Sequence, residues 1–185
     1  TEQGFSTVYA TIGSAIVGEV NALAQSGSFT TLYVTGHSLG ASLATLAAPG
    51  LARATGFPSP VLYNFASPRT GDPTFASLVD ALPTSWRVVN TNDEVPKLPP
   101  AVTFVIENGQ QKLYFYEHID SEYDVTFGEP IENLQDLEDD HAIGVRQDPA
   151  EIALVGARNV RHAVAIDLLP VGDVQLPHQR HLAVR

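Results

Sequence analysis

Residues Gly36-His37-Ser38-Leu39-Gly40 form a G-x-S-x-G pentapeptide. A serine hydroxyl is a weak nucleophile until the backbone presents it to a base and to oxyanion donors, and this spacing does so where a strand precedes it and a helix follows. Residues 31–35 are β-branched, aromatic or aliphatic and favour a buried strand. Residues 41–54 are rich in Ala and Leu and favour a helix. The two glycines let strand and helix approach closely around a strained turn, so the motif predicts a nucleophile at Ser38.

An acyl-transfer serine also needs a histidine base, and the base needs a carboxylate that fixes its tautomer. In folds with this motif the partners follow in the order serine, acid, histidine. Asp93 is the outstanding acid, 93 − 38 = 55 residues after Ser38 and just beyond a predicted strand at residues 86–90. Asn92 and Pro96 favour a turn that points a carboxylate off the strand end. On position alone, an Asx-turn or helix-capping role explains Asp93 equally well.

Predicted strands and helices alternate along the first half of the chain. Apolar residues at three- and four-residue spacing predict an amphipathic helix over residues 5–23 that ends near Gly27. Strands are predicted at 61–66 and 86–90, with a short helix near 74–81 between them. The alternation predicts an α/β fold, a mostly parallel sheet flanked by helices on both faces. Functional residues in such sheets gather at the carboxyl ends of strands, where the serine and the aspartate fall.

The second half of the chain is less regular. Residues 102–107 and 112–117 flank Asn108-Gly109 and predict a β-hairpin, because Asn-Gly supplies the positive φ values of a tight turn. Residues 149–169 predict another helix with apolar side chains on one side. The tail after Pro170 shows little pattern.

Composition fits one globular domain with a sizeable core: 185 residues, 44% hydrophobic and 17% charged. The formal net charge is −11. The stretch from Glu117 to Asp148 contains many acidic residues and a single basic one, Arg146. This balance argues against nucleic-acid partners and gives no attraction to anionic membranes, whereas an uncharged ester or lipid substrate is compatible with it. We favour a solvated acidic loop over a calcium site for this stretch.

Three absences bear on cellular context. The sequence contains no cysteine, so no redox compartment is indicated. No apolar run approaches the roughly eighteen residues of a transmembrane segment. The chain begins at Thr1 and contains no Met. We therefore expect a processed, trimmed or incompletely presented product, with any targeting signal upstream.

Four segments together resemble the class 3 lipases, the fungal-lipase-like branch of the α/β-hydrolases. They are Gly4-Phe5 with Tyr9, the serine motif in Val34–Ala44, the Ser-Pro-Arg loop in Tyr63–Asp72 and the aspartate loop in Val89–Pro100. The resemblance implies an α/β-hydrolase fold that lacks its N-terminal strands in this chain. Residues 1–185 would then be a single catalytic domain, the C-terminal part of a larger one.

The same resemblance implies Ser38 as the nucleophile and Asp93 as the acid that orients the base. Asp72 and Asp80, the nearby carboxylates, are left with structural roles. Neither a metal nor an organic cofactor is implied, and the family suggests a secreted, extracellular protein.

Four of the histidines are not expected to be the base. His37 lies inside the serine motif and is expected to be structural. His118 lies in a segment that resembles the one after the aspartate loop in the family, and the histidine of that family segment is not the base. His178 and His181 lie in the unpatterned tail.

His141 is the preferred base and His162 the alternative. His141 follows His118 by 141 − 118 = 23 residues, after an acidic loop, as the catalytic histidine does in bacterial and plant-like relatives. The aromatic residue that usually follows is absent from His141–Val145. The distance of His162 from His118 is closer to the fungal pattern, but His162 falls inside a predicted helix. A base must reach Ser38 from a loop or a helix start.

The oxyanion hole needs two backbone donors, and one is expected to be the N–H of Leu39, directly after the nucleophile. In the family the second donor and the lid come from polypeptide upstream of the serine motif, and this chain has 37 residues before Ser38. The strand at residues 31–36 would also be left with an unpaired edge. We therefore expect an upstream segment of the same polypeptide, or a partner chain, to complete the sheet and the oxyanion hole.

The sequence thus predicts a serine esterase or lipase that hydrolyses carboxylic esters, acylglycerols above others, at a lipid–water interface through an acyl-enzyme on Ser38. A feruloyl esterase or a phospholipase would use the same machinery, because substrate preference lies in the lid and the pocket. The alternative from another class is a non-catalytic hydrolase-like fragment. The intact motif argues against that alternative, and the missing upstream segment argues for it. A lipase would also expose apolar residues around the opening to Ser38.

Overall fold

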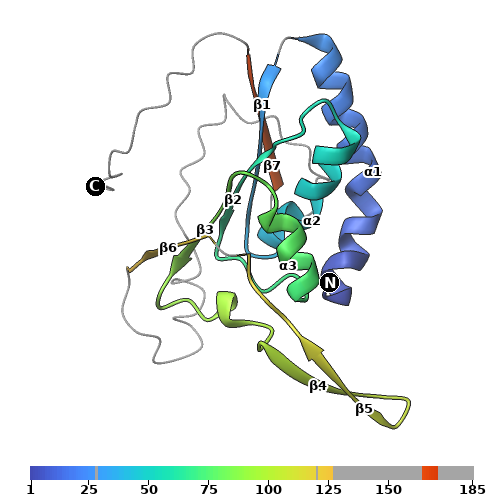
Figure 1. The fold of residues 1–185 in the computed structure, drawn as a ribbon, viewed down its shortest axis with the longest axis vertical. Coiled ribbons are helices and arrows are strands. Elements are labelled where there is room, and N and C mark those ends of the chain that lie inside the picture. Colours follow the sequence, from blue (N-terminus) through green and yellow to red (C-terminus); the bar gives the residue numbers. More distant parts are fainter. Residues whose placement is uncertain (28, 120, 127–163, 171–185) are drawn as a thin grey trace.

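The computed structural model describes residues 1–27, 29–119, 121–126 and 164–170. A five-stranded sheet has the order β6-β3-β2-β1-β7, and a separate two-stranded sheet pairs β4 with β5 (Figure 1). The elements are α1 (Gln3–Ser26), β1 (Phe29–His37), α2 (Leu39–Ala54), β2 (Val61–Phe65), α3 (Pro73–Asp80), β3 (Ser85–Asn90), the 3-10 helix η1 (Val95–Lys97), β4 (Val102–Glu107), β5 (Gln110–Phe115), β6 (Glu122–Val125) and β7 (Val164–Pro170).

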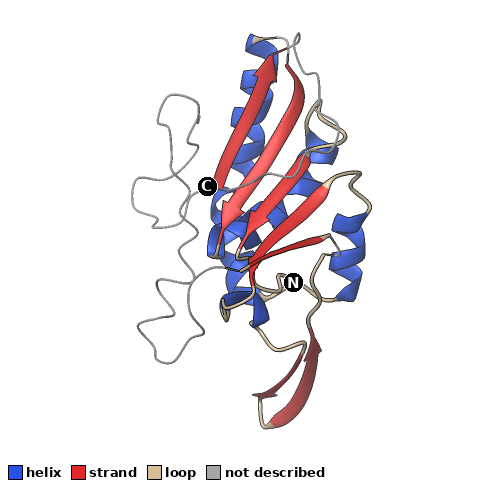
Figure 2. Ribbon diagram, turned by 90° about the vertical axis from the view of Figure 1, so that its left-hand side faces the viewer, coloured by secondary structure: helices blue, strands red, loops and turns tan. Residues whose placement is uncertain are grey.

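Four of the five strands in the larger sheet are parallel. β1 pairs with β2, β2 with β3 and β3 with β6 in parallel, whereas β7 pairs with β1 antiparallel. The carboxyl ends of β1, β2 and β3 therefore lie along one edge of the sheet (Figures 1 and 2). Any side chain that follows one of these strands directly lies at that edge.

One face of the sheet is covered by α1 and α2 (Figure 2). Alternate residues of β1 and β2, among them Leu32, Val34 and Leu62, are fully buried there. They pack with the Ala- and Leu-rich face of α2 and with α1 in one hydrophobic core. On the opposite face Tyr63 and Trp86, which are register partners, are exposed. Within the described residues the helical layer is thus on one face, whereas the sequence predicts helices on both.

Most elements of the first half agree with the sequence prediction. α1, α2, α3 and the first three strands lie where hydrophobic periodicity places them, within a few residues at each end. The hairpin turns at Asn108 and Gly109, both with positive φ, as the Asn-Gly pair predicts. No helix in the described part of the chain is both long and apolar enough to cross a membrane.

Strand β7 corrects two expectations. The sequence predicts a helix through residue 169, but Val164–Pro170 form a strand along the outer edge of β1. This run is short and largely aliphatic, and periodicity does not separate a buried strand from a helix over such a length. The premise that no part of this chain pairs that edge of β1 is therefore wrong. The earlier part of the predicted helix lies outside the described residues.

Strand β6 corrects a third expectation. Glu122–Val125 belongs to the acidic stretch interpreted above as a solvated loop, yet it pairs in parallel with β3 at the other edge of the sheet. Its first three side chains are exposed. An edge strand of this kind carries too few buried apolar residues to be recognised from its pattern.

Candidate active site

Ser38 occupies the junction between β1 and α2. Its backbone has φ 56° and ψ −126°, in the left-handed half of conformational space, where a residue with a Cβ is strained. A Cβ on Gly36 would lie 2.2 Å from the carbonyl oxygen of Gly40, so only glycine lets the helix start so close to the strand. The Ser38 side chain makes no capping bond to α2, and the residue is 9% exposed. The strained turn that the motif predicts is present.

The start of α2 places backbone donors beside Ser38. The helix begins at Leu39, so the Leu39 N–H belongs to the first turn, whose donors have no carbonyl four residues earlier to bond within the helix. The helix dipole adds partial positive charge at this end. Backbone N–H donors and partial positive charge are what stabilise a developing oxyanion.

Backbone hydrogen bonds continue the sheet ladder beyond the strand ends. The Ser38 N–H donates to the Phe65 carbonyl over 3.0 Å, and the Ala66 N–H donates to the Val88 carbonyl over 3.0 Å. Ala66 follows β2 as Ser38 follows β1, and it too has positive φ, 49°. The ends of β1, β2 and β3 are therefore held to one another by backbone bonds.

Asp93 lies three residues after β3 and is 1% exposed. Its N–H donates to the Asn90 carbonyl over 2.9 Å, and its Oδ1 accepts from the Val95 N–H over 2.9 Å. The Asx turn considered from the sequence is therefore present. A carboxylate has two oxygens and accepts several hydrogen bonds, so the Asx turn does not conflict with a role in orienting a base.

Ser38 and Asp93 lie at the same edge of the sheet, with β2 between the strands that carry them. Neighbouring strands are about 4.8 Å apart, which separates β1 and β3 by roughly 10 Å. An imidazole that bonds a hydroxyl on one side and a carboxylate on the other spans a gap of that order. His141 and His162, the two candidate bases, both lie outside the described residues. His162 falls inside the helix predicted over residues 149–169, and the last part of that range is the strand β7.

The loop after Asp93 is clamped by Arg69. The Arg69 N–H donates to the Leu98 carbonyl over 2.8 Å, and its guanidinium Nη1 donates to the Pro99 carbonyl over 2.9 Å and also to the Lys97 carbonyl. Arg69 belongs to the Ser-Pro-Arg loop after β2. This loop therefore holds the aspartate loop with both its backbone and its side chain, a role that the sequence alone did not indicate.

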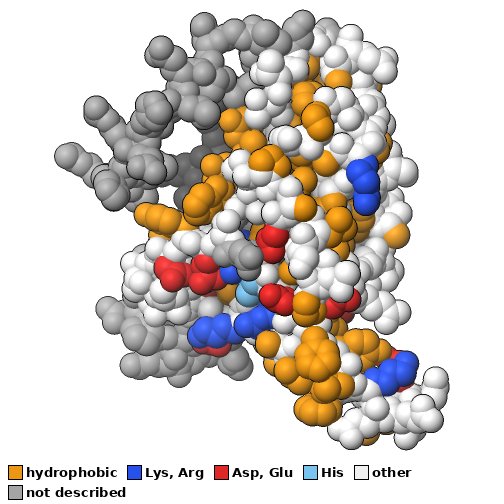
Figure 3. Space-filling model, viewed as in Figure 1, with side chains coloured by type: hydrophobic (Ala, Val, Ile, Leu, Met, Phe, Trp, Pro, Cys, Tyr) orange, Lys and Arg blue, Asp and Glu red, His pale blue; other side chains and the backbone are white. Residues whose placement is uncertain are grey.

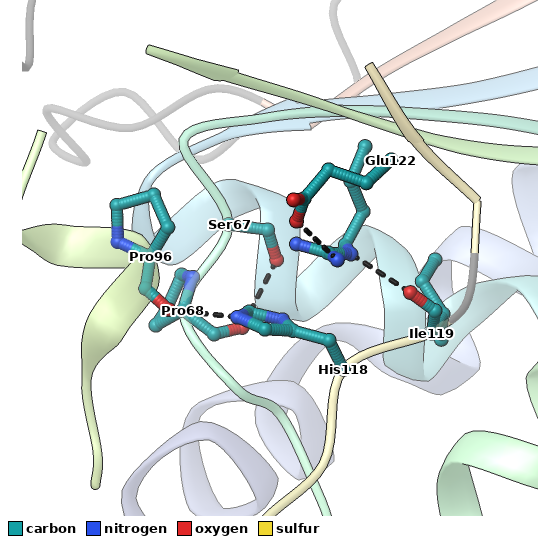
Figure 4. A network of polar contacts seen from close by, with 7 residues as sticks. Ser67, Pro68, Pro96, His118, Ile119 and Glu122 are labelled. Atoms are coloured by element: carbon teal, nitrogen blue, oxygen red, sulfur yellow. Dashed lines mark hydrogen bonds and ion pairs between the residues drawn. The ribbon is translucent and has the colours of Figure 1, made fainter. Parts of the chain in front are cut away.

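His118 holds the same loop one residue earlier (Figure 4). Its Nε2 lies 2.7 Å from the Pro96 carbonyl oxygen. A carbonyl only accepts, so Nε2 carries the proton in this contact. Burial, and then the positive charge of Arg87, lower the pKa of His118 to about 4. His118 is therefore a neutral, structural donor, in line with the expectation that it is not the base.

Arg87 is a buried cation that sequence reasoning missed. Its Nε donates to the Ile119 carbonyl over 2.9 Å, and its Nη2 forms an ion pair with Glu122 of β6 at 2.6 Å. The residue is 5% exposed. An arginine between Trp86 and Val88 in a predicted strand was the available signal, because a buried charge requires a partner. Arg87 ties β3 to β6 and to the segment that carries His118.

Three of the remaining predicted residues lie at the ends of strands or helices. His37 is the last residue of β1 and is the register partner of Phe65. Asp72 caps α3, its Oδ1 accepting from the Phe75 N–H over 2.8 Å, and Asp80 ends that helix. His178 and His181 lie outside the described residues. Within the described ranges, no three His, Cys, Asp or Glu side chains come together as a metal site.

A family model described as "Lipase (class 3)" matches residues 1–103. The secreted mono- and diacylglycerol lipase A of Penicillium cyclopium is 38% identical over 125 residues, which are 68% of this chain and 37% of that protein. The secreted mono- and diacylglycerol lipase 1 of Fusarium solani is 36% identical over 121 residues, 65% of this chain and 32% of that protein. The chain thus spans about a third of the length of these relatives.

Solved structures give the same comparison in three dimensions. A crystal structure described as the N225Q mutant of MDLA from Penicillium cyclopium superimposes with a TM-score of 0.55 at 37% identity, over 68% of this chain and 42% of that one. A structure described as a fungal lipase has a TM-score of 0.56 at 34% identity, over 70% of this chain and 43% of that one. Both comparisons agree with an α/β-hydrolase fold.

Proposed function

Because the chain belongs to the class 3 lipase family, we propose that it hydrolyses carboxylic esters, acylglycerols above others, through an acyl-enzyme on Ser38. The observation that carries the proposal is the strained Ser38 junction at the sheet edge that also bears the buried Asp93. Strain of this kind in a non-glycine residue persists where the surrounding structure fixes it, and it is typical of nucleophile turns. The names of the relatives support acylglycerols over feruloyl esters or phospholipids as substrates.

The chemistry proceeds in two stages. A histidine base takes the Ser38 hydroxyl proton while Oγ attacks the ester carbonyl, and Asp93 holds the protonated imidazole in orientation. The Leu39 N–H stabilises the tetrahedral oxyanion. The tetrahedral species collapses with loss of the alcohol, which takes the proton from the histidine. Water, deprotonated by the same histidine, then attacks the acyl-enzyme and releases the fatty acid, and Ser38 is restored.

We assign the base to His141, with His162 as the alternative, and the second oxyanion donor and the lid to polypeptide upstream of this chain. The spacing of His141 after the acidic loop, as in bacterial and plant-like relatives, supports this choice, whereas the distance of His162 from His118 is closer to the fungal pattern. The relatives are named as secreted lipases, which supports an extracellular site of action.

Labelling with an active-site-directed phosphonate tests the assignment. We expect one phosphonyl group per chain on Ser38, no labelling of Ser38→Ala, and normal labelling of Ser67→Ala. Ser67 is the matched control, because it is buried near the same edge but donates to the Pro68 carbonyl. Loss of a triad nucleophile lowers kcat on the order of a millionfold. A Ser38→Ala protein that keeps more than about a tenth of the activity would remove Ser38 from the mechanism.

The same assay separates the two histidines. We expect His141→Ala to abolish labelling and hydrolysis, and His162→Ala to retain both. The opposite pattern would transfer the base to His162. An intact protein that the phosphonate does not label would support the non-catalytic alternative.

A further inference from the structure

The β4–β5 hairpin leaves the body of the protein (Figure 1), and apolar side chains gather on it in the view of Figure 3. The register pairs Val102 with Phe115 and Phe104 with Leu113, and places Ile106 on the same side. These five side chains, called here the apolar hairpin face, are all exposed, Phe104 at 64% and Ile106 at 78%. Six of the twelve exposed large apolar residues in the described part of the chain lie in this hairpin. Exposed apolar side chains gathered in this way mark an interaction surface.

The other face of the hairpin carries polar contacts around a single exposed apolar residue, Val105. Lys112 forms an ion pair with Glu107, and the Tyr114 hydroxyl donates to the second oxygen of Glu107 over 2.7 Å. These contacts hold β4 and β5 together across their register. The charges cancel within the hairpin, although the whole chain carries −11.

The base of the hairpin is attached to the loops of the candidate site. The Tyr116 N–H donates to the Ala101 carbonyl over 2.9 Å, and the Glu117 N–H donates to the Gly71 carbonyl over 2.8 Å. Arg69, on the same loop as Gly71, binds the carbonyl of Pro99, which precedes the hairpin. The hairpin is therefore fixed to both loops that follow β2 and β3, and it extends beyond the end of the sheet at which Ser38 and Asp93 lie (Figure 1).

We propose that the apolar hairpin face inserts into the surface of an uncharged lipid phase and so holds the catalytic edge of the protein against it. The inference rests on the proposed function, since a lipid ester must reach Ser38 from such a phase. A face with no net charge on a strongly acidic protein fits a neutral acylglycerol surface and not an anionic bilayer. The sequence predicts an apolar patch around the opening to Ser38, and the hairpin places one at the same end of the sheet.

The test compares binding to triolein droplets coated with phosphatidylcholine. The double variant Phe104→Thr/Ile106→Thr removes the two most exposed side chains of the face and keeps residues that favour strands. Val105→Thr is the matched control, because Val105 is also exposed and apolar but lies on the opposite face of the hairpin. All variants are made in the Ser38→Ala background, so that binding is measured without hydrolysis. We expect the double variant to bind about tenfold more weakly or worse, and Val105→Thr to bind as the parent does.

Further readouts complete the test. Adding phosphatidylserine to the coat is expected to leave binding unchanged or to weaken it. With Ser38 restored, the double variant is expected to hydrolyse a soluble short-chain ester as fast as the parent. Equal droplet binding by parent and double variant overturns the inference. A parent that sediments as an oligomer and a double variant that sediments as a monomer also overturn it, because the face would then bind a second copy. A large fall in the Tm of the double variant overturns it too, because the face would then pack within the protein. Hairpin-dependent binding by a protein that hydrolyses no ester would refute the proposed function alone.

Discussion

Stability at mildly acidic pH is expected to depend on His118. The groups that act on its ring are Arg87 and Arg69, which lower its pKa, and Glu122 and the Pro96 carbonyl, which raise it, while burial is the largest effect. The result is a pKa of about 4 in the folded protein, against an ordinary value of 6.5. The unfolded chain therefore takes up a proton at this position as the pH falls through about 6.5, and the folded protein does not until about 4.

The sign follows from proton linkage. Between these two values the unfolded state binds more protons, so stability rises with pH and falls on acidification. For a single group with these two pKa values, the loss between pH 7.5 and pH 5 is about 2 kcal/mol. Most carboxylates are still ionised at pH 5, so this interval separates His118 from general acid denaturation.

His118→Gln is the informative variant, because its amide N–H can still donate to the Pro96 carbonyl and does not titrate. We measure the free energy of unfolding in urea at pH 7.5 and at pH 5. Between these two pH values we expect it to fall by about 2 kcal/mol more in the parent than in the variant. Equal losses in both proteins would refute the reasoning. If the variant does not fold, titration of the His118 ring by NMR in the parent decides instead, and a pKa near 6.5 would contradict it.

Three other substitutions test the loops around the site. Gly36→Ala places a Cβ 2.2 Å from the Gly40 carbonyl oxygen and is expected to cost about 3 kcal/mol in urea unfolding; a neutral result would contradict the close approach of strand and helix. Arg69→Lys loses the paired bonds to the carbonyls of the aspartate loop and is expected to lower kcat more than it changes KM, with a stability loss of about 1–2 kcal/mol; unchanged kinetics would show that the clamp does not position Asp93. Asp72→Ala removes the cap of α3 and is expected to lower stability by about 1 kcal/mol, whereas Asp72→Asn keeps the acceptor and is expected to lose much less.

Local sequence was sufficient for the features that depend on a few neighbouring residues. The G-x-S-x-G pentapeptide determines the turn at Ser38, since its two glycines allow the strand and the helix to meet there. Asn108-Gly109 determines the hairpin turn by the same reasoning about positive φ. The periodicity of residues 5–23 determines α1, because a helix buries side chains that lie three and four positions apart.

Tertiary structure decided the features that join distant parts of the chain. Val164–Pro170 is a strand because the edge of β1 supplies its hydrogen-bond partners, and nothing within the run itself excludes a helix. Arg87 and His118 acquire their roles only when β3, β6 and the aspartate loop come together. Burial lowers the pKa of His118, and burial is a property of the packed chain. Likewise, Asn108-Gly109 predicts the hairpin, but only the arrangement of the whole sheet leaves one face of that hairpin exposed at the end of the sheet that carries Ser38.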